Sequence, residues 1–125
     1  MNRNDSIVAL RPTVQKQSTE HTKEELFQNE VLRPILKLQH DLLLHEWQEN
    51  PLFLPIKKAD TIEERRKLLA LLFSKHPPFL QRLVGMIVGL LTSVEFQYYL
   101  EEKAALDKRI KALLLTRLLS DEYSA

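Results

Sequence analysis

The chain of 125 residues has no cysteine and only two glycines. Without cysteine, neither a disulfide framework nor a thiolate metal site can form. Both glycines, Gly85 and Gly89, lie inside one apolar stretch, so the glycine-rich loops that cradle nucleotide phosphates are excluded. We therefore expect no cofactor held by such a loop, and the sequence predicts no other cofactor.

The chain also has no excess of one charge sign, because its 18 Lys and Arg residues are nearly balanced by 17 Asp and Glu residues. This balance gives no electrostatic reason to expect nucleic acid or anionic lipid as a partner. The longest apolar run, residues 83–91, is far shorter than the roughly 20 residues that cross a bilayer. The apolar residues Ile7–Leu10 are too few for a signal peptide. We expect a cytoplasmic protein with no membrane partner.

What the sequence does contain favours helix. Hydrophobic residues make up 44% of the chain, leucine dominates them, and good helix formers such as Glu, Lys and Arg fill the remainder. The length suits one domain. We predict an all-α fold, a compact bundle of four to five helices over residues 21–120. Residues 1–20 are predicted to be a mobile arm, and residues 121–125 a frayed C-terminus.

Helix starts are marked by N-cap signatures, in which Thr or Asp lies three residues before a glutamate. They are Thr22-Lys23-Glu24-Glu25, Asp60-Thr61-Ile62-Glu63 and Thr92-Ser93-Val94-Glu95. Apolar residues at steps of three and four then predict helices that end near residues 49, 75 and 119. A helix from Pro78 to Leu91 lies between the last two. The segment Pro51–Pro55 is predicted to be an apolar loop, either covering the core or binding a partner.

Pro34 interrupts the first helical pattern, because proline lacks an amide proton and clashes with the preceding turn. Either one helix kinks there, or a helix ends near Leu32 and a second begins with Pro34 in its first turn. Proline also disfavours helical angles at Arg33, which favours two helices.

Gly85 and Gly89 are four residues apart and share one helix face. Each costs roughly 1 kcal/mol of helix stability relative to alanine, so a packing role is expected. Absence of side chains lets a second helix approach closely. We predict a central, buried, glycine-striped helix.

The sequence contains no Glu-x-x-His pair and no His-Glu-x-x-His motif, and it predicts neither a metal site nor a catalytic residue. One mixed polar and aromatic cluster is a candidate small-ligand site: His40, Asp41, His45 and Tyr98. The alternative is ordinary packing, with an Asp41–His45 hydrogen bond one helical turn apart.

Two hypotheses for function remain. The first is a helical interaction protein that forms a homodimer, or binds an unknown protein partner, through an apolar face containing Leu115 and Leu119. It is based on a leucine surplus wider than one helix stripe at the end of the last helix. The second is a ligand-binding or enzymatic bundle with its site near Asp41, His45 and Tyr98.

The segment Leu26–Leu42 resembles the opening motif of a small all-helical bacterial family. The run Gly85–Gly89, the Thr92-x-x-Glu95 box and Asp107-Lys108-Arg109-Ile110 resemble it too, so the likeness spans residues 22–119. The resemblance implies a helical fold and no catalytic residue. Some members are labelled glyoxalase, but βαβββ glyoxalases need strands and a His/Glu metal set, which this sequence does not show. If the family shares a site, Arg33-Pro34 and Gln39-x-Asp41 are the positions to probe.

Overall fold

The computed structural model describes residues 2–13 and 22–120, and all regular structure in that part of the chain is helical. The elements are α1 (Arg3–Leu10), α2 (Lys23–Phe27), η1 (Gln28–Leu32), α3 (Arg33–Leu38), α4 (His40–Glu49), η2 (Pro51–Phe53), α5 (Leu54–Lys57), α6 (Ile62–Lys75), α7 (Pro77–Val88), α8 (Ser93–Glu101) and α9 (Lys103–Leu118). The all-α prediction is confirmed, but the helices outnumber the four or five expected.

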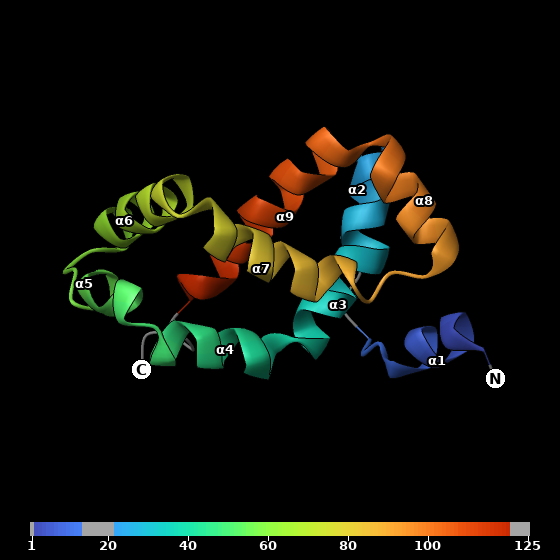
Figure 1. Ribbon diagram of the computed structural model, residues 1–125, viewed down its shortest axis with the longest axis horizontal. Helices are drawn as coiled ribbons and strands as arrows, with labels where there is room; N and C mark the ends of the chain where they lie inside the picture. Colours follow the sequence, from blue (N-terminus) through green and yellow to red (C-terminus); the bar gives the residue numbers. More distant parts are fainter. Residues whose placement is uncertain (1, 14–21, 121–125) are drawn as a thin grey trace.

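Helix α7 runs across the middle of the molecule, with α4 along one side of it and α9 crossing behind it (Figure 1). The core gathers side chains from all the longer helices. Its fully buried members include Leu32, Ile35, Leu43, Trp47, Phe53, Leu69, Leu83, Ile87, Leu106, Ile110 and Leu114. Helical periodicity in the sequence predicts a buried stripe in the last helix, made of Leu106, Ile110, Leu113 or Leu114, and Leu118. It is confirmed, with Leu114 fully buried and Leu113 only partly buried.

Local capping chemistry sets three helix starts, two at the predicted residue and one a residue later, at Thr61 instead of Asp60. The Thr22, Thr61 and Thr92 side chains accept hydrogen bonds from the backbone amides of Glu25, Glu64 and Glu95. At Thr92 the box is reciprocal, because Glu95 Oε1 accepts from the Thr92 amide at 2.8 Å. Each pair satisfies amides that no helical carbonyl can reach.

Pro34 does not separate two helices, contrary to the interpretation we favoured. Residues 23–38 form one continuous helix, and Arg33 keeps helical angles (φ −63°, ψ −44°). The turn Gln28–Leu32 just before the proline is π-helical, and the Arg33 amide donates to the Gln28 carbonyl. This wider turn adjusts the hydrogen-bond ladder at the point where Pro34 has no proton to donate.

The segment Pro51–Pro55 is helical, not the loop we expected. A 3₁₀ turn, η2, passes directly into α5, and Pro51 and Pro55 each lie in the first turn of one of these elements. Proline is tolerated there because a first-turn amide needs no helical partner. Phe53 and Ile56 are buried in the core, whereas Leu52 and Leu54 are exposed.

The single long helix predicted over residues 93–119 is divided into α8 and α9. The break is at Glu102 (φ −119°, ψ 32°), and α8 and α9 meet at a sharp bend in Figure 1. Across this bend Tyr99 donates a hydrogen bond of 2.5 Å to Asp107 Oδ1. Within the first turns of α9, Lys103 pairs with Asp107 Oδ2 at 2.7 Å.

The glycine stripe of α7 does not pack against another helix. Gly85 and Gly89 are both exposed, and a Cβ added at Gly85 would have no described atom within 4 Å. Helix α7 contributes to the core through its opposite side, where Leu83 and Ile87 are fully buried. The prediction of close helix packing at the glycines is therefore wrong.

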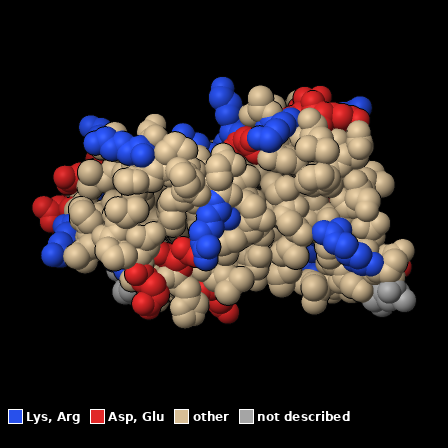
Figure 2. All heavy atoms as spheres, in the orientation of Figure 1, with Lys and Arg blue, Asp and Glu red and all other residues tan. Residues whose placement is uncertain are grey.

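On the face shown in Figure 2, charged side chains of both signs are scattered among larger uncharged areas.

The first part of the predicted N-terminal arm forms helix α1, Arg3–Leu10, where the sequence predicted a mobile segment. The Arg3 guanidinium donates to the carbonyls of Leu91 (2.9 Å) and Gly89 (3.0 Å), and Asn4 accepts from the Ser93 amide at 3.0 Å. These contacts place α1 on the connection between α7 and α8. Residues 14–20 of the predicted arm and residues 121–125 lie outside the described part of the chain.

Candidate functional site

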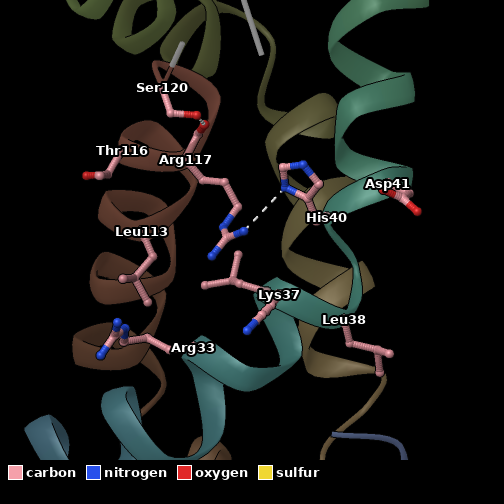
Figure 3. Close-up of a pocket in the computed structure, with 10 residues that line it drawn as sticks. Arg33, Lys37, Leu38, His40, Asp41, Leu113, Thr116, Arg117 and Ser120 are labelled. Atoms are coloured by element: carbon pink, nitrogen blue, oxygen red, sulfur yellow. Dashed lines mark hydrogen bonds between the residues drawn. The ribbon is translucent and has the colours of Figure 1, made fainter. Parts of the chain in front are cut away.

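A cleft of about 850 Å³ lies between the α3–α4 region and the C-terminal half of α9 (Figure 3). Its walls combine cationic, hydroxyl and apolar side chains. The lining residues are Arg33, Leu36, Lys37, Leu38, His40, Asp41, Leu113, Thr116, Arg117 and Ser120.

Helical spacing puts the cations on the walls. Arg33 and Lys37 are one turn apart in α3 and therefore share a face. Arg117 lies in the last turn of α9, where the carbonyl ends of the helix favour positive charge. In Figure 3 the Arg117 side chain extends from α9 toward α4, and the Arg33 side chain extends from α3 toward α9. Helices α3 and α9, which are far apart in sequence, thus both contribute cationic side chains to the lining of the cleft.

Arg117 and His40 connect the two walls. Arg117 Nη1 lies 3.4 Å from His40 Nδ1 (Figure 3). A guanidinium has donors only, so the His40 nitrogen must be the acceptor in this contact.

The remaining polar groups are partly engaged with the backbone. Lys37 Nζ donates to the Thr13 carbonyl at 3.1 Å, and Ser120 Oγ donates to the Arg117 carbonyl at 2.9 Å. Asp41 is the single carboxylate among the described lining residues, and its side chain points away from Arg117 (Figure 3). Among the described lining residues, the cationic side chains Arg33, Lys37 and Arg117 therefore outnumber the single carboxylate.

The four residues of the predicted ligand cluster do not share one space. His40 and Asp41 line the cleft, whereas His45 borders a separate hollow beside Glu46 and Tyr98 borders a third beside Phe27. Asp41 and His45 are both exposed, and no hydrogen bond joins them in the described structure. Of the four residues, the structure thus brings together only His40 and Asp41, which are adjacent in sequence.

Tyr98 is held by packing. Its ring centroid is 5.0 Å from that of Phe27, and its hydroxyl is buried without a hydrogen-bond partner among the described residues. An orphaned hydroxyl in an apolar contact contributes little to fold stability, since its desolvation is uncompensated.

The predicted interface residues lie largely inside the molecule. Leu119 is 5% exposed and belongs to the core, and Leu115 is half-buried against it. In the single chain, the leucine surplus of α9 is thus mostly used to fill the core, and Leu119 offers little surface to a second copy.

Sequence reasoning named Arg33 as a position to probe but missed Lys37 and Arg117. The Arg33–Lys37 spacing of one turn was visible in the sequence. Nothing in the sequence indicated that the end of α9 lies beside α3, and that juxtaposition creates the cleft.

Comparison with protein-family models, with curated proteins and with solved structures finds no match for this chain. The resemblance to a small bacterial helical family therefore stays a prediction. Among the described helices, none combines the length and apolar character needed to cross a membrane. The described residues also contain no group of three or more Asp, Glu or His side chains placed to hold a metal ion.

Proposed function

We propose that the chain binds a ligand carrying a carboxylate or phosphate group in the cleft between α3 and α9. The observation that carries this proposal is the placement of Arg33, Lys37 and Arg117 around one cleft whose acidic lining residue points elsewhere. Arg and Lys side chains supply donors and no acceptors, so the chemical complement of this lining is an anion.

The cleft supports binding more than catalysis. Ser120 Oγ is occupied with a backbone carbonyl, and the His40 nitrogen that faces the cleft interacts with a guanidinium, not with a hydroxyl nucleophile. Clefts lined by one sign of charge focus the electric field and raise the local concentration of counter-ions. Because this cleft is open to water, we expect a simple anion to bind with a Kd on the order of 1 mM, equivalent to about −4 kcal/mol.

Amide chemical shifts test the proposal directly. The ¹⁵N-labelled chain is titrated with inorganic phosphate and, at matched ionic strength, with succinate. Saturable shifts are expected at the amides of Arg33, Lys37 and Arg117. The Arg117→Gln variant should weaken phosphate binding by about tenfold, the effect of losing one charge-assisted pair.

Arg66→Gln is the matched control, because it removes the same charge from an exposed position on α6 that does not line the cleft. Lys37→Gln is a second test variant at an exposed position, where the fold should tolerate the change. Equal affinities in Arg117→Gln and Arg66→Gln, or shifts that never saturate, would overturn the proposal.

A further inference from the structure

The cleft continues into a second hollow along α9. This hollow has a volume of about 350 Å³, is lined in part by Gln28, Lys108 and Arg109, and shares Leu113 and Thr116 with the cleft. Shared lining residues make the two hollows one groove. From Lys108 to Arg117 the groove follows α9 for about 14 Å at 1.5 Å per residue, and Ser120 lies just beyond the end of the helix.

Cations stand at both ends of this groove. Arg109 is at one end, where its Nη1 donates to Gln28 Oε1 at 3.0 Å, and Arg117 is at the other, in contact with His40. The two positions are eight residues apart on α9, which corresponds to about 12 Å along the axis. Glutamine holds the Arg109 guanidinium without neutralising its charge, so both ends of the groove remain cationic.

Between the two ends the groove is mainly apolar. Leu113 and Thr116 are common to both hollows, Leu36 lines the cleft and Ala112 lines the second hollow. A ligand that covers this stretch must carry apolar groups between its anionic groups. A nucleic-acid or polyphosphate backbone lacks them, and neither hollow has a Phe, Tyr or Trp among its described lining residues to stack bases.

From these features we infer that the groove binds an acidic segment of another polypeptide, with carboxylates at both ends and apolar side chains over Leu113. This inference rests on the proposed anion binding and adds the class of partner. Recognition of acidic segments by clustered Arg and Lys is a recurrent mode, and helical segments in grooves provide alternating acidic and apolar contacts.

The test uses the full chain and a fluorescent peptide of about 12 residues, a helix long enough to cover the groove. The peptide carries Glu at every third or fourth position with Leu and Ala between, and a second peptide has Gln in place of every Glu. A single-stranded oligothymidylate is the nucleic-acid probe. Fluorescence anisotropy measures each Kd with the wild-type chain and with Arg117→Gln, Arg109→Gln, Lys108→Gln and Arg66→Gln.

The Glu peptide should bind more tightly than phosphate does and at least about tenfold more tightly than the Gln peptide, a difference of about 1.4 kcal/mol. Its affinity should fall in the variants at both ends of the groove and stay unchanged in Arg66→Gln. Lys108 is exposed, so Lys108→Gln tests the second hollow even if loss of the Arg109–Gln28 bond weakens the fold.

Three outcomes would overturn the inference. In the first, peptide affinity depends on Arg117 but on neither Lys108 nor Arg109, so only the cleft binds. In the second, the oligothymidylate binds as tightly as the Glu peptide. In the third, neither peptide binds although phosphate still shifts the cleft amides, which would leave the proposed anion site standing without its polypeptide partner.

Discussion

Arg11 and Glu95 form a two-bond ion pair across 84 residues of sequence. Arg11 Nη1 donates to Glu95 Oε2 at 2.8 Å and Nη2 donates to Oε1 at 2.5 Å, and both side chains are largely shielded from water. Glu95 also closes the capping box at the start of α8. One carboxylate therefore fixes a helix start and holds the end of α1 against it.

Glu95→Gln should destabilise the fold at neutral pH, and the effect should depend on pH. Burial alone would raise the pKa of Glu95, but the hydrogen bonds from Arg11 and Thr92 and the charge of Arg11 outweigh it and lower the pKa below 4.5. Since the folded-state pKa is depressed, the stabilisation is present above the unfolded-state pKa and is lost as pH falls through the folded-state value.

Urea denaturation at pH 7 and at pH 3 measures this effect. At pH 7 we expect Glu95→Gln to lower the free energy of unfolding by about 1–3 kcal/mol, the range for hydrogen bonds to charged groups. The difference in free energy of unfolding between wild type and Glu95→Gln should be smaller at pH 3. Glu101→Gln, at an exposed position on the same helix, is the control. A difference of equal size at both pH values would contradict the role assigned to the Glu95 carboxylate.

Gly85→Ala should stabilise the chain. The position is exposed within α7, and an added Cβ meets no described atom within 4 Å, so only the helix propensity changes, by about 1 kcal/mol. Thermal unfolding should show a rise in Tm of a few degrees. Gly89→Ala should gain less, because its Cβ would lie 3.0 Å from the Gly85 carbonyl oxygen. A lower Tm for Gly85→Ala would instead indicate that this face packs closely against another helix.

The adjacent residues Tyr98 and Tyr99 should respond oppositely to loss of the hydroxyl. Tyr99 donates to Asp107, so Tyr99→Phe should cost about 1 kcal/mol. The Tyr98 hydroxyl is buried with no described partner, so Tyr98→Phe should be neutral or stabilising. Chemical denaturation of the two variants side by side measures both. If Tyr98→Phe were the more destabilising change, the Tyr98 hydroxyl would have a structural partner that the described residues do not supply.

Local chemistry explains what the sequence could predict. Thr22 and Thr92 were recognised as caps, and the third cap was placed one residue early, at Asp60 instead of Thr61. An N-cap bonds to amides within the next turn, so its spacing can be found in the sequence alone. The α9 stripe, with Leu106 and Ile110 as examples, followed from helical periodicity. Both features require no knowledge of which helix packs against which.

What could not be predicted depends on contacts between distant segments. Nothing around Glu102 marks the α8–α9 break, since neither glycine nor proline is near it. Helix α1 buries only Ile7, and Arg3 and Arg11 attach it by polar bonds that periodicity cannot show. The candidate site could not be predicted for the same reason. Lys37 and Arg117 line one cleft only because α3 and α9 lie side by side in the fold.

Phosphate should stabilise the folded chain beyond the effect of its ionic strength. A ligand that binds only the native state at about ten times its Kd adds about 1.4 kcal/mol to the free energy of unfolding. Thermal unfolding in phosphate is compared with unfolding in sodium chloride at the same ionic strength, for wild type, Arg117→Gln and Arg66→Gln. The rise in Tm beyond that in sodium chloride should appear in wild type and in Arg66→Gln. It should be strongly reduced in Arg117→Gln, because Arg117 lines the cleft and Arg66 does not. An equal rise in all three proteins would mean that phosphate acts by general exclusion from the surface and not by occupying this cleft.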